Sequence, residues 1–191
     1  MPQALNVIAV SGSVFSPSRT LTLVQALIKA LEDRLDIDSQ VIQLEDIARH
    51  TGKVFARHEL PAHIDAKLRS IESADLLIVG TPVYRGSLSG QLKHVFDLID
   101  QNALIDTPVL LAATGGSDRH ALIIDHQMRP LFSFFQALTL PIGVYASSAD
   151  YNDYEIESKA LLARILLAAD RAGLHFPTHA RTQATAQYQA A

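Results

Sequence analysis

Hydroxyl side chains gather in one short turn near the start of the chain. Residues 11–20 read S-G-S-V-F-S-P-S-R-T and lie between an apolar run at 5–10 and an apolar-periodic stretch at 21–35. Gly12 lets the backbone come close to a ligand, and Arg19 adds a fixed positive charge. The helix that follows contributes unpaired N–H groups and the positive end of its dipole. The turn therefore predicts a phosphate site, although serine-rich turns also occur as plain helix caps. The hydroxyl donors are Ser11, Ser13, Ser18 and Thr20.

Two commoner phosphate-binding motifs do not fit this turn. A dinucleotide-binding turn needs the three glycines of G-x-G-x-x-G, and residues 11–20 contain only Gly12. A P-loop needs a lysine, and none occurs between Met1 and Ile28. A loop built on hydroxyls suits a terminal monophosphate, whose several oxygens all accept hydrogen bonds.

Length, composition and charge limit the class of protein. The chain has 191 residues, 48% of them hydrophobic and 19% charged, which fits one α/β domain over residues 1–176. A net charge of −4 and the lack of a basic stripe argue against a nucleic-acid partner. The chain has no cysteine, so thiolate chemistry and disulfides are excluded. We expect no membrane span and a cytoplasmic location. The tail 177–191 lacks an apolar face, and we expect it to be disordered or to lie on a partner subunit.

Strands and helices are predicted to alternate along the chain. The predicted strands are Leu5–Val10, Ser39–Leu44, Leu76–Gly80, Val109–Ala113 and Leu140–Tyr145. The predicted helices are Leu21–Arg34, His63–Ser73, Gly90–Gln101, Asp118–Ala137 and Ile156–Ala172, with an irregular excursion at 45–61. Five βα units indicate an α/β fold of the flavodoxin-like, doubly wound kind, with a five-stranded parallel sheet in the order 2-1-3-4-5.

Small and polar residues follow the first, third and fourth predicted strands. The segment 81–87 reads T-P-V-Y-R-G-S, and the segment 114–118 reads T-G-G-S-D. In the order 2-1-3-4-5 these strands are neighbours, and ligands bind beyond their carboxyl ends, where the strand order reverses. The three loops therefore predict one site. The segment 147–154, after the fifth strand, is expected to be a plain loop or a rim.

The second and third loops indicate a planar ring beside the phosphate. Pro82 fixes the backbone, Gly86 permits an open conformation, and Tyr84 and Arg85 offer a ring and a cation. The glycine pair at 115–116 lets the backbone approach a ring without obstruction. A phosphate together with a planar ring that has imide-like edges describes flavin mononucleotide, FMN. Taken alone, the second loop would be a tight turn before a helix capped at residue 89.

One block of sequence resembles a known family. The stretch 80–100, G-T-P-V-Y-R-G-S-L-S-G-Q-L-K-H-V-F-D-L-I-D, together with S-G-S at 11–13 and T-G-G-S at 114–117, is similar to the NAD(P)H-dependent FMN reductases. The nearest likeness is to the reductases that serve alkanesulfonate and methanesulfonate monooxygenases. The resemblance extends over residues 5–176 of this chain.

The resemblance implies a function and a set of site residues. Members of this family are flavodoxin-like homodimers or homotetramers that reduce FMN with NADH or NADPH and release it to a separate flavin-dependent monooxygenase. By motif, the phosphate contacts fall on Ser11, Ser13, Ser18, Arg19 and Thr20. The ring contacts fall on Pro82, Val83, Tyr84, Arg85, Gly86, Ser87, Thr114, Gly115, Gly116 and Ser117.

Little catalytic chemistry is required of the side chains. In hydride transfer the cofactors react with each other, and the protein supplies position and electrostatics, so we expect no general acid or base. Arg85 and the amides of Gly115 and Gly116 are candidates for stabilising reduced, anionic flavin. The histidines of the chain lack tight metal-ligand spacing, so no metal site is predicted.

A proline interrupts the fourth predicted helix. The runs 121–124 and 131–135 make this helix apolar around most of its circumference, which predicts a subunit interface. Pro130 would clash with the carbonyl of His126, and a one-residue bulge around His126 would relieve the clash. Sulfonate-system reductases are similar in carrying an aromatic insertion in this helix at a tetramer interface. Our hypothesis is that the bulge at His126 modulates flavin release; an ordinary proline kink is the alternative.

Other flavin proteins with this fold remain as alternatives at this stage. Quinone and azo-compound reductases hold FMN as a bound prosthetic group, and a flavodoxin-type electron carrier has no nicotinamide chemistry of its own. Flavodoxin-type carriers are usually more acidic than this chain. A phosphorelay receiver needs acidic residues after the first strand, where this chain has Ser11 and Ser13, so that class is excluded.

Overall fold

A parallel β-sheet forms the centre of the protein. The computed structural model describes residues 4–179. The sheet has the strand order β2-β1-β3-β4-β5, with β6 also paired to β4, and every neighbouring pair is parallel. This is the doubly wound arrangement that the sequence predicts. The strands are β1 (Leu5–Ser11), β2 (Ile37–Gln43), β3 (Leu76–Pro82), β4 (Pro108–Gly115), β5 (Leu138–Thr139) and β6 (Val144–Ser147).

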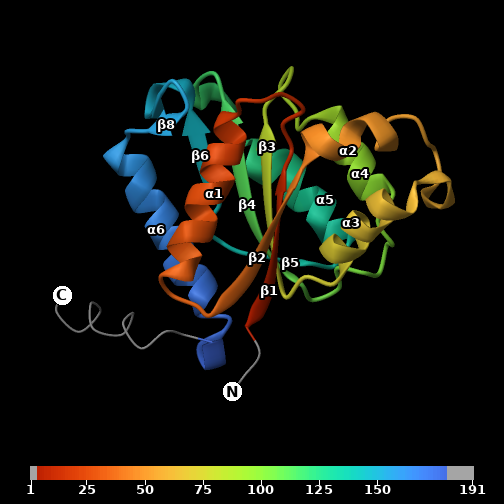
Figure 1. Ribbon diagram of the computed structural model, residues 1–191. Helices are drawn as coiled ribbons and strands as arrows, with labels where there is room; N and C mark the ends of the chain where they lie inside the picture. Colours follow the sequence, from red (N-terminus) through yellow and green to blue (C-terminus); the bar gives the residue numbers. More distant parts are fainter. Residues whose placement is uncertain (1–3, 180–191) are drawn as a thin grey trace.

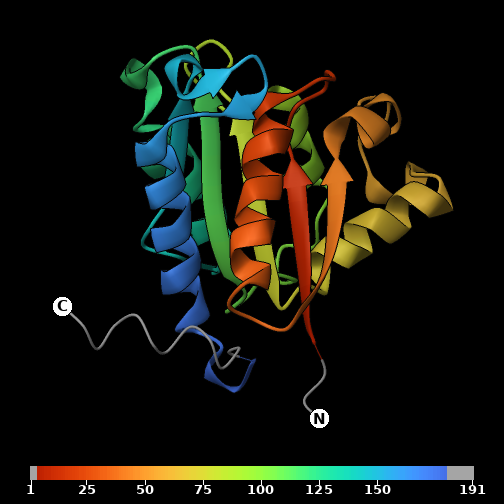
Figure 2. The ribbon, with the colours of Figure 1, turned by 60° about the vertical axis from the view of Figure 1, so that its left-hand side comes forward.

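Helices cover both faces of the sheet (Figures 1 and 2). Two helices lie on one face: α1 (Arg19–Glu32) and α6 (Lys159–Gly173). Four helices lie on the other: α2 (Leu44–Thr51), α3 (Ala62–Glu72), α4 (Gly90–Asp97) and α5 (Arg129–Phe134). Successive residues of β1 point to opposite faces, so Val7 enters the core beneath α1 and Ile8 enters the core on the other side. Both faces are buried, which is why β3 and β4 are continuous apolar runs.

The register of the strands brings several loops to one edge of the sheet. Ser11 pairs with Gly80, and Gly115 pairs with Ser147, so β1, β3, β4 and β6 end close to the same level. The chain leaves β1 toward β2 on one side, whereas β3 lies on the other side. Loops that follow β1 and β3 therefore diverge, and this edge, which we call the crest, is where a ligand has room.

The structure corrects the predicted irregular excursion at 45–61. Residues Leu44–Thr51 form α2, and Leu44, Ile47 and Thr51 are fully buried on one side of it. Glu45 and Asp46 lie in its first turn, where negative charge favours the helix dipole. The helix is so short that its periodicity was hard to separate from a polar loop. The rest of the segment, residues 52–61, is irregular apart from a short 3₁₀ turn, Arg57–Glu59.

The predicted fifth strand, 140–145, overlaps the structure only at the start of β6, and the two-residue strand β5 lies before it, so the sheet has six strands rather than five. β5 and β6 both pair with β4, and Pro141 lies between them. Proline has no N–H to donate to a neighbouring strand. Arginine side chains hold the break instead: Arg129 donates to the carbonyls of Leu140 and Pro141, at 2.9 and 3.0 Å, and Arg164 donates to that of Gly143 at 3.0 Å.

The predicted helix 118–137 is also interrupted. It consists of a 3₁₀ turn (Asp118–His120), a π-helix (Ile124–Met128) and the α-helix α5. The π-helix includes His126, so the bulge predicted there from Pro130 is confirmed. In addition, α4 ends at Asp97, four positions before the predicted end.

Two short elements follow β6 at the crest. A 3₁₀ turn (Ser148–Asp150) leads into a small antiparallel hairpin made of β7 (Tyr151–Asn152) and β8 (Glu155–Ile156). Within 4–179, no helix is long and apolar enough to cross a membrane. Of the predicted C-terminal tail, only Pro177–His179, a 3₁₀ turn, belongs to the described residues, and the remainder lies outside them.

Candidate functional site

A shallow cavity of about 200 Å³ lies at the crest. It is lined by Arg19, Pro82, Val83, Thr114, Gly115, Gly116, Ser148 and Tyr151. The structure thus brings together predicted residues from all three loops. It also adds Ser148 and Tyr151, which come from the segment expected to be a plain loop or a rim. The cavity is smaller than the roughly 300–1,000 Å³ of pockets that enclose a small molecule, so a flavin held here keeps part of its surface uncovered.

The hydroxyls of the first loop mainly hold the loop together. Ser18 caps α1 by accepting from the Leu21 amide at 3.3 Å. Ser13 Oγ donates to the carbonyl of Phe15 at 3.0 Å. Ser11 and Ser13 are buried and do not line the crest cavity. The plain helix cap, which was the alternative to a phosphate site, is therefore present, and it places the start of α1 beside the cavity.

Two hydrogen bonds tie the third loop to its neighbours. Thr20 Oγ1 and Thr114 Oγ1 lie 2.6 Å apart and are both buried, which joins the first loop to the third. The Val83 amide donates to the Thr114 carbonyl at 2.8 Å, which joins the second loop to the third. Hydrogen bonds therefore join the three loops to one another.

The second loop is a tight turn. The amides of Tyr84 and Ser87 donate to each other's carbonyls, at 2.9 and 3.1 Å. Arg85 and Gly86 between them have φ angles of 53° and 79°, in the left-handed region that a glycine adopts easily. Pro82 and Val83 line the crest cavity, whereas Tyr84, Arg85, Gly86 and Ser87 lie in the turn beyond it. The second loop thus forms the tight turn that the sequence left as an alternative, and this turn lies at the rim of the crest cavity.

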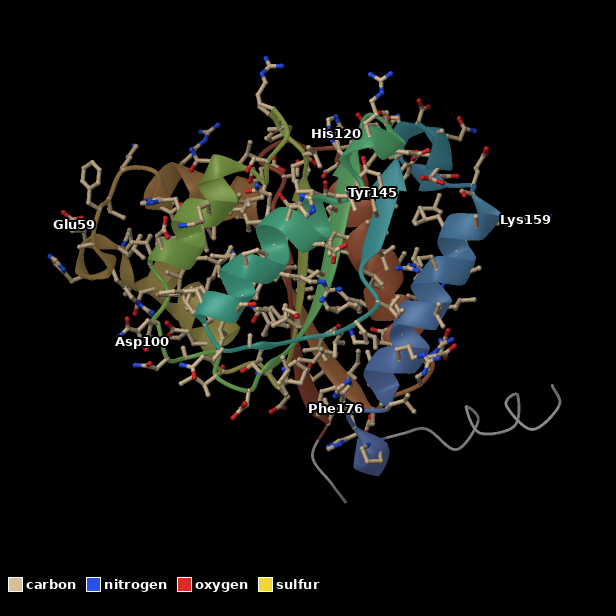
Figure 3. The ribbon with its side chains drawn as sticks, turned by 180° about the vertical axis from the view of Figure 1, so that it is seen from behind. Glu59, Asp100, His120, Tyr145, Lys159 and Phe176 are labelled. Atoms are coloured by element: carbon tan, nitrogen blue, oxygen red, sulfur yellow. The ribbon has the colours of Figure 1, made fainter. Side chains whose placement is uncertain are left out.

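Tyr145 on β6 supports the third loop from below. Its Oη donates to the carbonyl of Ser117 at 2.5 Å, and Figure 3 shows it at the end of the sheet where the loops gather. Burial, and then the negative charges of Asp118 and Asp150, raise the pKa of Tyr145, so it remains a donor at neutral pH. A Cβ at position 115 would collide with this hydroxyl, which explains why the residue there is glycine.

Arg19 is held by the segment that follows β6. Its Nε donates to the carbonyl of Asp153 at 2.6 Å, and its Nη1 donates to Ser148 Oγ at 3.1 Å. Its guanidinium lies 5.6 Å from the ring centre of Tyr151 and 5.9 Å from that of Tyr154. Arg19 is the one charged residue that lines the cavity, so the cavity favours an anion.

Ser148, Tyr151 and Tyr154 could not be assigned to the site from the sequence, because they lie far from Arg19 along the chain. The usable signal was the placement of Tyr151 and Tyr154 just after a strand that ends at the crest.

Burial and the charge of Asp150 raise the pKa of Tyr151, although Arg19 opposes this, so the Tyr151 hydroxyl stays protonated and donates to the Arg19 carbonyl at 3.2 Å.

A cavity larger than the one at the crest lies on the α4 and α5 side of the second loop, with the predicted residue Ser87 in its lining. It has a volume of about 760 Å³ and lies between α4 and α5, with aromatic side chains in its wall. Phe134 in this wall is 66% exposed. His126 is exposed on the π-helix and lines neither this cavity nor the one at the crest. The lining of the larger cavity also includes polar and charged side chains, among them Lys93, Asp97 and Gln127, but it contains none of the predicted residues of the first and third loops.

The donor set at the crest fits FMN. A guanidinium and the start of α1 face the place for a phosphate. Backbone from Pro82, Val83, Gly115 and Gly116 faces the place for a ring. No described atom lies within 4 Å of a Cβ built on Gly116, so the ring can approach the backbone there.

Comparisons with known proteins show the family to which this sequence is similar. Residues 5–152 match the family model described as NADPH-dependent FMN reductase. The chain is 64% identical over 179 residues to the NADH-dependent FMN reductase SfnF of Pseudomonas fluorescens, covering 94% of this chain and 96% of the relative. It is 64% identical over 172 residues to an FMN reductase (NADPH) of Pseudomonas aeruginosa, covering 90% and 92%.

A solved structure supports the fold. The flavodoxin, WrbA-like protein from Agrobacterium tumefaciens superposes with a TM-score of 0.65 at 17% identity, over 92% of this chain and 99% of that one. The flavodoxin-like fold predicted from the sequence is thereby confirmed.

We predict that Gly115→Ala lowers the free energy of unfolding by about 1–3 kcal/mol, because the added methyl group displaces Tyr145. Urea unfolding measures the change. Gly116→Ala is the matched control, with open space at its Cβ and an expected effect within about 0.5 kcal/mol. Adding Tyr145→Phe to Gly115→Ala removes the colliding hydroxyl and should recover part of the loss. Equal losses of unfolding free energy for Gly115→Ala and Gly116→Ala would contradict the collision with Tyr145.

Proposed function

This chain belongs to the NADPH-dependent FMN reductase family, and we propose that it supplies the FMN it reduces to a separate, sulfonate-type flavin-dependent monooxygenase. It is an oxidoreductase that reduces FMN with NADH or NADPH. The observation that carries this conclusion is that the matched region, 5–152, contains every residue that lines the crest cavity.

The proposed ligand pose follows from the charge and shape of the crest. The phosphate of FMN lies beside Arg19 and the start of α1, where the N–H groups and the helix dipole favour an anion. The ring lies against Pro82, Val83 and the 114–116 backbone. Bound FMN supplies the hydride acceptor, and the chain orients it. Ser87 lines the cavity between α4 and α5. The other predicted residues that do not line the crest cavity are Ser11, Ser13, Ser18, Thr20, Tyr84, Arg85, Gly86 and Ser117.

The shape of the crest cavity bears on how FMN meets the reduced nicotinamide and the monooxygenase. The shallow cavity leaves a flavin face open to a reduced nicotinamide and lets reduced flavin depart toward the monooxygenase. No general acid or base is assigned, because hydride transfer between cofactors depends on their position. We place the protein in the cytoplasm, where reduced nicotinamide is formed, and we treat residues 1–176 as one domain.

We further propose that the protein is a homodimer or homotetramer that associates through the apolar surface of α4 and α5. Phe134, in the wall of the cavity of about 760 Å³, is 66% exposed there. Exposed aromatic groups on a packed helix are typical of subunit interfaces. The π-helix with His126 directly precedes this surface, so association can influence the elements near the site.

The first prediction concerns the flavin that is accepted. With NADH or NADPH in excess, kcat/KM for FMN should exceed that for riboflavin by roughly 10- to 100-fold, because riboflavin leaves the charge-assisted donors unpaired. Steady-state oxidation of each nicotinamide with FMN, FAD and riboflavin measures this. Equal rates with FMN and riboflavin would contradict the phosphate site. Lack of nicotinamide oxidation with every flavin would contradict the function.

The second prediction concerns assembly. Phe134→Glu places a charge on the α4–α5 surface and should reduce the assembly to a smaller species at micromolar concentration. Light scattering coupled to gel filtration gives the mass. Phe55→Glu is the matched control, because Phe55 is 95% exposed beside the Arg57–Glu59 turn. A wild-type monomer, or the same mass for Phe134→Glu as for the wild type, would refute this interface.

The third prediction concerns the π-helix. His126→Ala should change the rate of FMN release and the turnover number by several-fold, because the bulge alters the helix that leads from the third loop to the interface. Stopped-flow release of FMN is the direct measurement. His58→Ala, at an exposed histidine on a distant turn, serves as the control. Unchanged release and turnover in His126→Ala would count against a role for the bulge.

A further inference from the structure

The segment after β6 encloses the Arg19 side chain. Ser148, Tyr151, Asp153 and Tyr154, which we call the Arg19 clamp, lie more than a hundred positions away in the sequence. Two of them accept hydrogen bonds from the guanidinium, at 3.1 and 2.6 Å. The other two place aromatic rings within 6 Å of it, which is the range of a cation–π interaction.

The clamp holds the cation without neutralising it. Asp153 uses its backbone carbonyl, Ser148 uses a hydroxyl, and the tyrosines use their ring faces. By contrast, Arg57 is paired with Asp65 and Glu72, and Arg129 with Asp125. Over the described span 4–179, no carboxylate forms an ion pair with Arg19. Among the described residues, no ion-pair partner therefore competes with an anionic ligand for this guanidinium.

The clamp is itself rigidly built. The Asp150 carboxylate accepts from the amide of Ser147 at 2.7 Å, and the Asp150 carbonyl accepts from the amides of Glu157 and Ser158. Asp153 has a φ of 51°, in the left-handed region, which turns the chain within the β7–β8 hairpin. These bonds fix the direction of the carbonyl that receives Arg19.

Such fixing matters for the affinity of an anion. A free arginine side chain has rotamer entropy, part of which is lost when the side chain binds a ligand. An arginine already held in place loses less on binding, so the same contacts give higher affinity. The guanidinium has five N–H donors, and two of them are used by the clamp. The rest are left for phosphate oxygens.

We propose that the Arg19 clamp, and Tyr154 in particular, is a positioning element that sets the preference of this site for a flavin with a terminal monophosphate. The proposal rests on the FMN reductase function. Tyr154 acts through Arg19 and does not touch the flavin. Tyr151 is buried and also bonds the Arg19 carbonyl, so its loss would disturb the core. Tyr154 is 43% exposed, which makes it the better position to test.

The test compares Tyr154→Leu with Tyr154→Phe, which keeps the aromatic face. Dissociation constants for FMN and riboflavin are measured by quenching of flavin fluorescence. We expect Tyr154→Leu to weaken FMN binding by roughly 3- to 10-fold, since a cation–π contact of this kind is lost. Riboflavin binding should be unchanged, and Tyr154→Phe should stay within about twofold of the wild type for both ligands. An equal loss for both flavins would show a merely structural role and overturn the proposal.

A double-mutant cycle tests whether Tyr154 acts through Arg19. Arg19→Gln alone should weaken FMN binding at least as much as Tyr154→Leu does. In the Arg19→Gln background, Tyr154→Leu should have no further effect, because the cation that it positions is absent. Additive losses would overturn the proposal. Failure of the wild type to reduce FMN would instead refute the function itself, so the two failures are distinguishable.

Discussion

The crest depends on one unneutralised guanidinium held at the start of a helix. Arg19 is the first residue of α1, and α1 begins where the loop after β1 ends. Its orientation comes from the segment after β6, which reaches the crest because β6 pairs with β4 at the level of Gly115 and Ser147. The buried bond between Thr20 and Thr114 fastens the helix start to the third loop. Because the parallel strands end at the same level, four segments that are distant in the sequence meet around the Arg19 guanidinium.

Two cavities on the protein differ in size and in lining. The crest is small and polar, with a cation and much exposed backbone, as an anionic cofactor requires. The cavity between α4 and α5 is larger and has aromatic groups in its wall, which suits the interface that we propose there. They are linked through the second loop and the π-helix, where Ser87 Oγ donates to the side-chain oxygen of Gln127 at 3.3 Å. The crest cavity is the smaller of the two, but it is the one that residues of all three predicted loops line, together with the guanidinium of Arg19.

The sequence predicted much of the fold because its signals are local. The buried strands β1, β3 and β4 are continuous apolar runs, and α1 and α4 carry their own caps at Ser18 and Ser89. The bulge at His126 also followed from a local rule, since Pro130 cannot donate to the residue four positions earlier. The short helix α2 and the break at Pro141 were missed because tertiary contacts decide them. Arg129 and Arg164 stabilise that break from other elements.

The site was predicted unevenly for the same reason. Its three loops could be placed together because strand order and register follow from the fold class. What each side chain does could not be predicted. Ser13 and Ser18 satisfy their own loop, and Tyr84 to Ser87 close a turn. Conversely, Ser148 and Tyr151 line the cavity only because the chain returns to Arg19 after β6. Pairings over such separations are a property of the folded chain.

A crystal structure of the protein with bound FMN tests the central claim most directly. The account predicts the phosphate within hydrogen-bonding distance, about 2.7–3.2 Å, of Arg19 and of the first amides of α1. It also predicts the flavin ring along the 82–83 and 114–116 backbone, with one face uncovered. A phosphate bound elsewhere, or FMN lodged between α4 and α5 with the crest left vacant, would contradict it.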